Sequence, residues 1–78
     1  MIKQHVKFIT TGQLMNFYNT CRGFDSEVNV RDIENKRLDV NGKCLQDMMS
    51  VQLGLPVCMV IHGSDEKKAV NILKKYTI

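Results

Sequence analysis

The residues best suited to chemistry in this chain are two histidines and three cysteines, and their spacing limits what they can do. His5 falls on the polar side of an alternating N-terminal stretch, and His62 ends an apolar run in the C-terminal half. If these stretches form neighbouring strands, the two imidazole rings could meet on one face of a sheet. No carboxylate or thiol stands at ligand spacing to complete a metal site there. We therefore predict solvated histidines, no bound metal and no cofactor.

The cysteines, Cys21, Cys44 and Cys58, are odd in number and lack metal-ligand spacing, which favours reduced thiols and no structural disulfide. Cys21 and Cys58 lie in apolar runs, where a cysteine usually packs as a small buried side chain. Cys44 stands at an expected helix start beside Lys43, and both the helix dipole and a neighbouring cation favour a thiolate. Cys44 is therefore a redox candidate, and a capping or packing role remains open.

The rest of the chain contains no catalytic set. It has no Ser/His/Asp arrangement, no carboxylate pair in an apolar setting, no phosphate-binding loop and no dinucleotide fingerprint, so we predict that it is not an enzyme. A length of 78 residues, 44% of them apolar and 24% charged, fits a single domain over residues 1–78. Scattered basic residues with few aromatics do not favour a nucleic-acid partner. Without a membrane-spanning apolar window or a signal-peptide core, we expect a cytoplasmic protein that does not engage a membrane.

The C-terminal half predicts a helix, a buried strand and a second helix. The spacing of apolar residues indicates a short helix over residues 45–53, which Gly54 and Pro56 would end. The run VCMVI at residues 57–61 has the length and branched composition of a central strand. Ser64 can cap the next helix. The apolar stripe of that helix comprises Ala69, Val70, Ile72, Leu73 and Tyr76.

The N-terminal half predicts a strand, a helix and a hairpin. Apolar and polar residues alternate over residues 2–9, as in a half-buried strand. Thr11 can cap a helix that Gly23 ends. Two short strands follow near residues 28–30 and 38–40, joined by a charged turn. The order β-α-β-β-α-β-α favours an α+β protein in which helices cover one face of a small antiparallel sheet.

Several stretches resemble the HPr phosphocarrier family. VNGKCL at residues 40–45 is similar to the family's V-N-x-K-S-I/L run, and MSV at residues 49–51 is similar to its later M-S-L. DEKKAV at residues 65–70 resembles the D-E-x-x-A-L/V start of the last helix, and FYNTCRGF at residues 17–24 resembles the F-V-x-x-A-x-x-F first helix. The similarity covers nearly the whole chain. It implies an HPr-like open-faced β-sandwich, with a four-stranded antiparallel sheet covered on one face by three helices.

One segment departs from the family pattern. Working family members carry G-L-H-A/T-R-P between the first strand and the first helix, where the histidine takes phosphate from Enzyme I and passes it to a sugar transporter. Between Ile9 and Phe17 this chain has only TTGQLMN, which is shorter and lacks histidine, arginine and proline. Phosphotransfer of this kind needs an imidazole nucleophile near a helix N-terminus. Cys44 also replaces the regulatory serine of some members.

The leading hypothesis is a non-phosphorylatable HPr-like adaptor or regulator, whose partner is a phosphotransferase-system component or a transcriptional regulator. In the family, the phosphosite neighbourhood and the second helix form one docking face. The residues that map onto or beside it, and are predicted to bind the partner, are Met15, Cys44, Leu45, Met48 and Met49. Because successive helical residues point about 100° apart, one of the two adjacent methionines should face water. Two alternatives remain: a phosphocarrier that uses an atypical residue or works beside a true HPr, and a thiol switch at Cys44.

Overall fold

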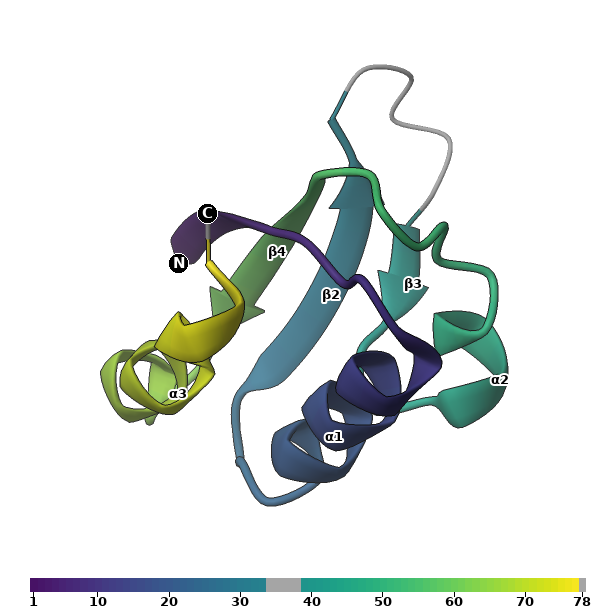
Figure 1. The fold of residues 1–78 in the computed structure, drawn as a ribbon. Coiled ribbons are helices and arrows are strands. Elements are labelled where there is room, and N and C mark those ends of the chain that lie inside the picture. Colours follow the sequence, from purple (N-terminus) through teal and green to yellow (C-terminus); the bar gives the residue numbers. More distant parts are fainter. Residues whose placement is uncertain (34–38, 78) are drawn as a thin grey trace.

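Four antiparallel strands form one sheet in the order β1-β4-β2-β3 (Figure 1). The structure is a computed structural model that describes residues 1–33 and 39–77. The strands are β1 (Ile2–Val6), β2 (Glu27–Asp32), β3 (Asp39–Asn41) and β4 (Val57–His62). The predicted turn between the hairpin strands begins later than expected, because Arg31 and Asp32 still belong to β2. The rest of that turn and Leu38 lie largely outside the described residues.

Three helices lie on one side of this sheet, and the other side is left open (Figure 1). The helices are α1 (Thr11–Cys21), α2 (Leu45–Met48) and α3 (Glu66–Leu73), and the short 3-10 helix η1 (Lys74–Tyr76) follows α3. The α+β class and the order β-α-β-β-α-β-α are therefore confirmed. None of the helices within the described residues is long and apolar enough to cross a membrane.

Strand β4 lies inside the sheet, and its residues alternate between two environments. Val57, Met59 and Ile61 are buried beneath the helices. Cys58 and Val60 alternate with them and point to the open face. β1 and β2 flank β4 on its two sides, as the apolar run predicted. The prediction that Cys58 is a buried hydrophobe is wrong, since it is half-buried on the open face, whereas Cys21 is fully buried.

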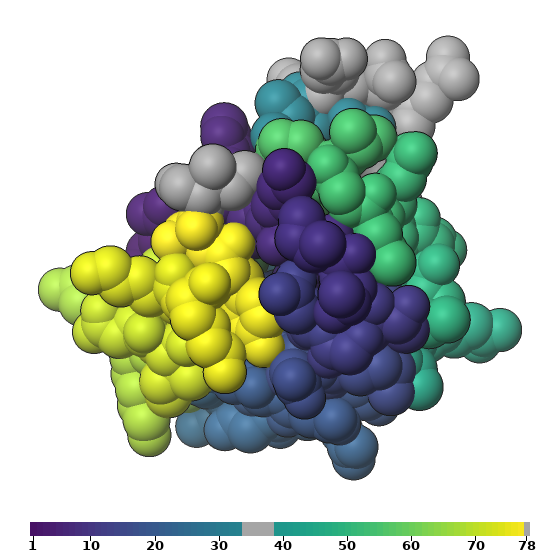
Figure 2. All heavy atoms as spheres, in the orientation of Figure 1, coloured from purple at the N-terminus to yellow at the C-terminus, as the bar shows by residue number. Residues whose placement is uncertain are grey.

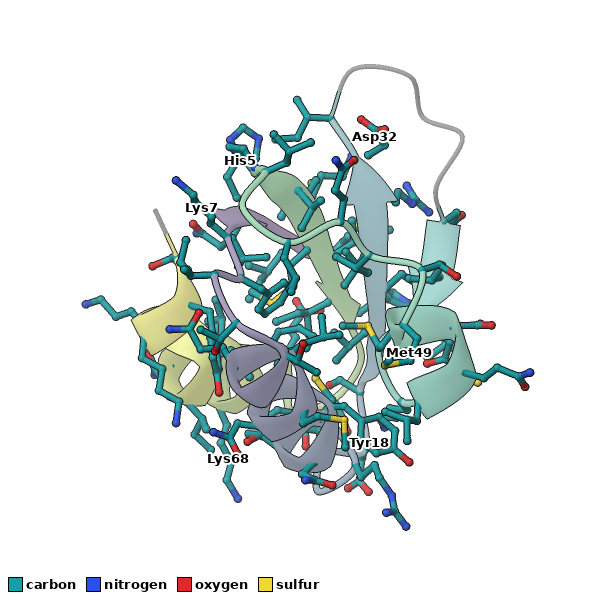
Figure 3. All side chains as sticks on the ribbon, turned by 45° about the vertical axis from the view of Figure 1, so that its right-hand side comes forward. His5, Lys7, Tyr18, Asp32, Met49 and Lys68 are labelled. Atoms are coloured by element: carbon teal, nitrogen blue, oxygen red, sulfur yellow. The ribbon has the colours of Figure 1, made fainter. Side chains whose placement is uncertain are left out.

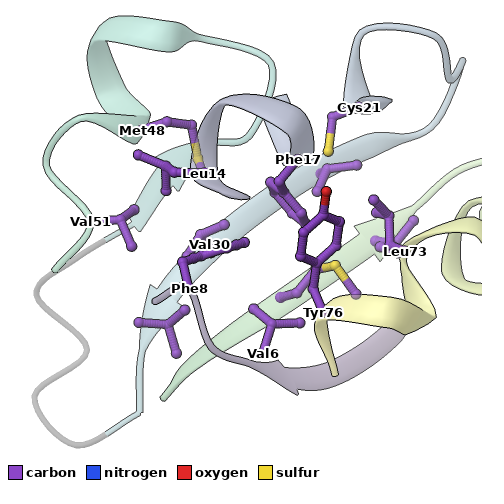
Figure 4. Close-up of a cluster of buried hydrophobic side chains, with 14 of the residues drawn as sticks. Val6, Phe8, Leu14, Phe17, Cys21, Val30, Met48, Val51, Leu73 and Tyr76 are labelled. Carbon is purple, nitrogen blue, oxygen red and sulfur yellow. The ribbon is translucent and has the colours of Figure 1, made fainter. Parts of the chain in front are cut away.

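The core between sheet and helices is built around three aromatic rings (Figure 4). The ring of Phe8 lies 4.9 Å from that of Phe17 and 5.8 Å from that of Tyr76, centroid to centroid, and Phe17 and Tyr76 are 5.5 Å apart. These rings join the end of β1, helix α1 and the C-terminal 3-10 helix. In the space-filling view the C-terminal segment, in yellow, therefore lies against the dark purple start of α1 (Figure 2).

The helix caps differ from prediction at both predicted positions. Thr10, not Thr11, caps α1, and its hydroxyl accepts a hydrogen bond from the Gln13 amide at 3.2 Å. Asp65, not Ser64, occupies the cap position of α3, and its carboxylate does not bond to that helix. The Asp65 side chain instead accepts hydrogen bonds from the loop after α1, so it makes a tertiary contact in place of a helix cap.

Helix α2 is a single turn and ends at Met48, well before the predicted end at residue 53. The amides of Met48 and Met49 bond four residues back, whereas those of Ser50 and Val51 bond only three residues back. This tightening turns Val51 into the core and stops the helix. The predicted apolar stripe of α3 is confirmed at Ala69, Leu73 and Tyr76, which are buried, but Ile72 is exposed.

Candidate partner-binding surface

The two methionines of α2 have opposite environments. Met48 is completely buried in the core, whereas Met49 exposes 59% of its surface (Figure 3). The expectation that adjacent helical residues diverge is confirmed. Met48 can act in partner binding only by supporting α2 from beneath, because its own side chain is closed to solvent.

The loop before α2 is held by backbone contacts with β2. The Gly42 amide donates to the Val28 carbonyl at 2.7 Å, and the Asn41 side chain accepts from the Lys43 amide at 2.9 Å. A Cβ at Gly42 would lie 3.1 Å from Val28, so glycine permits this close approach. These contacts fix Cys44 at the first position before α2.

The side chains around Cys44 do not all point as the sequence suggested. Cys44 is half-buried and makes no capping hydrogen bond through its sulfur. The Lys43 ammonium donates to the Phe24 carbonyl, in the loop after α1. The Lys43 ammonium is therefore held by the loop after α1, and a redox role of Cys44 stays a prediction.

Helix α1 contributes the remaining predicted residue, Met15. Met15 and Leu45 are both half-buried, and α1 packs beside α2 in the fold (Figure 1). Four of the five predicted binding residues thus keep some exposure across two adjoining helices, and Met48 is the exception.

Three further apolar residues, which follow β1 or α2 in the chain, are exposed, and none of them was predicted to bind a partner. Ile9 is 57% exposed, Leu53 is 38% exposed and Leu55 is 50% exposed. Gly54, between the two leucines, has a φ of 83° and donates its amide to the Phe8 carbonyl at 2.7 Å, which brings both leucines beside the end of the β1 segment. The sequence signal was present, because two leucines flank a glycine that was already predicted to turn the chain.

The segment between β1 and α1 is short and internally satisfied. The Ile9 amide donates to the Gln13 side-chain oxygen at 2.8 Å, and Thr10 caps the Gln13 amide. No histidine lies between Val6 and Phe17. The first turn of α1 therefore has neither an imidazole nor a free Gln13 amide to offer a phosphoryl group.

The two histidines do not meet. His5 pairs with Cys58, and His62 lies four residues further along β4, a separation of about 13 Å at roughly 3.3 Å per residue. Within residues 1–33 and 39–77, no three His, Cys, Asp or Glu side chains are grouped so as to hold a metal ion.

The pKa values of Asp65 and Cys21, which lie outside this surface, are shifted for clear physical reasons. Hydrogen bonds from the Ser26 hydroxyl and the Asp25 amide lower the pKa of Asp65, because they stabilise its charged form. Burial raises the pKa of the Cys21 thiol to about 12, although the positive charge of Lys43 acts in the opposite direction. Cys21 is therefore a packing residue.

No protein-family model and no curated protein matches the chain. Solved structures do match it. HPr-C-His from Thermoanaerobacter tengcongensis superposes with a TM-score of 0.79 at 26% identity, over 96% of this chain and 89% of that one. The phosphocarrier protein HPr from Bacillus anthracis superposes with a TM-score of 0.78 at 18% identity, over 99% of this chain and 96% of that one. The chain has an HPr-like fold.

A third match with this HPr-like fold is Crh, the catabolite repression containing protein of Bacillus subtilis. Its TM-score is 0.69 at 23% identity, over 91% of this chain and 80% of that one, and that crystal structure is described as a swapped, intertwined dimer. The open-faced sandwich implied by the sequence resemblance is thus confirmed. The similarity is to HPr proteins, one of them described as a phosphocarrier, and to Crh.

Proposed function

We propose that this HPr-like protein lacks phosphocarrier activity and acts as an adaptor or regulatory binding protein of the sugar phosphotransferase type. The observation that carries the proposal is the short connection from β1 to α1. It contains no histidine, and the amides of Ile9 and Gln13 already donate to the side chains of Gln13 and Thr10. An imidazole nucleophile is needed to accept a phosphoryl group from a donor such as Enzyme I. Nothing in that connection supplies one.

The two histidines elsewhere in the chain are poorly placed to substitute. His5 points to the open face of the sheet, whereas α1 and α2 lie on the covered face (Figure 1). A phosphoryl donor that docks on the helices would therefore have the sheet between itself and this ring. A carrier that uses an atypical residue is thus the weaker alternative.

The proposed binding surface consists of Met15, Cys44, Leu45 and Met49, with Met48 supporting it from the core. Exposed methionine suits an interface because its flexible, polarizable side chain can repack against different partners. Ile9, Leu53 and Leu55 would extend this apolar surface. The proposed partner is a protein of the phosphotransferase system or a transcriptional regulator, and the proposed compartment is the cytoplasm.

Incubation with phosphoenolpyruvate and Enzyme I tests the loss of carrier activity. Intact-mass measurement should show no added phosphate on this protein, while an authentic HPr in the same reaction gains one. A stoichiometric, acid-labile adduct on His5 or His62 would contradict the proposal. An acid-stable adduct elsewhere would favour the atypical carrier instead.

A further inference from the structure

The open face of the sheet carries a pocket of about 380 Å³, on the side away from the helices. Its residues come mainly from β1, β4 and β2. Such a volume is at the low end of the range for small-molecule sites, which limits the ligand to a small molecule. Val60 is buried in this pocket although no helix within the described residues covers it.

Strand register places four polar side chains in one row across this pocket. His5 pairs with Cys58, Cys58 pairs with Arg31, and Arg31 pairs with Asp39. Residues directly opposite each other on neighbouring antiparallel strands have Cβ atoms roughly 5 Å apart, so their side chains adjoin. Lys3 stands two residues from His5 on the same face of β1. The same end of the sheet carries His5 and Asp32 in Figure 3.

The pocket lining holds two cations, Lys3 and Arg31, and two carboxylates, Asp32 and Asp39, but the basic side chains keep unused hydrogen-bond donors. The Arg31 Nε atom lies 3.5 Å from the Asp39 carboxylate, too far for a good hydrogen bond, and this buried nitrogen has no acceptor within residues 1–33 and 39–77. Asp32 also lines the pocket, but it is already engaged in an interaction. The side chains of Lys3 and His5 form no hydrogen bond or ion pair with other described residues.

We infer that this pocket binds a small oxyanion, the phosphate group of inorganic phosphate or of a small phosphomonoester. Lys3 and Arg31 would donate charge-assisted hydrogen bonds from the two sides of β4, and the His5 ring would add a donor. Val60 and Cys58 would form the floor. Because the pocket lies on the face opposite α2, the ligand and a protein partner could be bound at the same time. The inference is independent of the proposed adaptor function.

A titration of the ¹⁵N-labelled protein, followed by NMR at constant ionic strength, tests this site. Inorganic phosphate and glycerol phosphate are the two probes, with chloride as the reference anion. We expect saturable shifts in the amides of Lys3, His5, Arg31 and Cys58 with at least one probe. The tighter probe shows whether the natural ligand is free phosphate or an ester.

Charge-removing variants supply the matched comparison. Lys3→Gln and Arg31→Gln should each weaken binding roughly tenfold, because each removes a charge-assisted hydrogen bond. Lys67→Gln, which removes the same charge from the exposed face of α3, should change affinity less than about twofold. Because Lys3 is exposed, Lys3→Gln keeps the test valid even if Arg31→Gln perturbs the sheet.

Cys58 gives an independent readout within the pocket. Bound phosphate should slow alkylation of Cys58 and leave the rate at Cys44 unchanged. Three results would each overturn the inference. They are shifts that never saturate, an equal loss of affinity in Lys67→Gln, and shifts centred on Lys7 and Lys75, which line a separate pocket beside α1.

Discussion

The two faces of the sheet differ in burial and charge, and strand β4 contributes residues to both. Its residues that point to the helices, such as Met59 and Ile61, are completely buried and hold the molecule together. Its residues that point the other way, Cys58 and Val60, lie among charged side chains in an open pocket. The charged side chains of the pocket thus lie on the open face, which contributes little to the apolar core. Residues there can change without loss of the core.

The helix-covered side shows a second contrast, between its interior and its outer surface. Phe8, Phe17 and Tyr76 form its interior (Figure 4), whereas Met49 remains exposed on its outside (Figure 3). Single exposed apolar residues are common, but several that adjoin one another mark a surface that can bind a protein. The proposed protein partner would thus bind outside the helices, and the proposed anion would bind on the open face of the sheet.

The largest effect is expected from the aromatic core. Phe17→Ala should lower the free energy of unfolding by about 3–5 kcal/mol, because it removes a buried ring that contacts both Phe8 and Tyr76. A small domain has only roughly 5–15 kcal/mol in total. Urea unfolding measures the change. His5→Ala on the open face is the comparison and should stay within about 0.5 kcal/mol of the parent; similar losses in both variants would remove the distinction between the faces.

Thiol labelling distinguishes the buried core from the accessible surface. At neutral pH Cys21 should alkylate about a thousandfold more slowly than an ordinary thiol, because burial raises its pKa from 9.0 to about 12 and each pKa unit is a factor of ten in thiolate. Cys44 and Cys58 are half-buried and should label in the native protein. Peptide mass after limiting reagent gives the rates, and rapid native labelling of Cys21 would show that the covered face opens.

A charge at Met49 tests the outer surface without touching the core. With Enzyme I taken as the proposed phosphotransferase-system partner, Met49→Glu should weaken its binding by roughly tenfold or more, because the variant places a carboxylate within an apolar contact. Its free energy of unfolding should change by less than about 0.5 kcal/mol. Calorimetric titration and urea unfolding give the two quantities.

The matched control for Met49→Glu is Asn71→Glu, which adds the same charge to an exposed position of α3. It should leave Enzyme I binding unchanged. Equal affinities for Met49→Glu and the parent would show that Met49 is outside the interface. Unfolding of that variant would show instead that its exposed side chain has a core role.

The sequence predicted the elements that depend on local pattern. The central strand, the left-handed turn at Gly54 and the buried stripe of α3 all follow from the spacing of apolar residues and glycine. The predicted end of α2 and the predicted cap of α3 were wrong, because Val51 is buried in the core and Asp65 bonds to the loop after α1. These tertiary contacts compete with helix continuation and capping. Local propensity contains no information about those contacts.

The candidate sites were predictable to different degrees. The divergence of Met48 and Met49 follows from helical geometry alone. The row from His5 to Asp39 requires knowledge of which strands pair and in what register, and β4 lies between β1 and β2 although it is last in sequence. The predicted burial of Cys58 was wrong for the same reason, because an apolar run does not reveal which alternate residues face outward.

The smallest expected effect concerns acid stability on the covered side. Asp65 joins the start of α3 to the loop after α1, where its carboxylate accepts from the Asp25 amide at 3.0 Å and the Ser26 amide at 2.9 Å. These bonds lower the pKa of Asp65 in the folded protein below its ordinary value of 3.8. The stabilisation is therefore fully present above pH 3.8 and is lost as the pH falls through the folded-state pKa.

Asp65→Asn should lower the unfolding temperature at neutral pH and flatten its decline between about pH 4 and pH 2, because the variant has no proton to take up at this position. Asp39→Asn is the open-face control. Its exposed ion pair with Arg31 spans 3.5 Å and should contribute little, so its acid profile should follow that of the parent. If Asp39→Asn flattened the profile more than Asp65→Asn, the electrostatic stabilisation would lie on the open face. The division between a structural covered side and a variable open side would then fail.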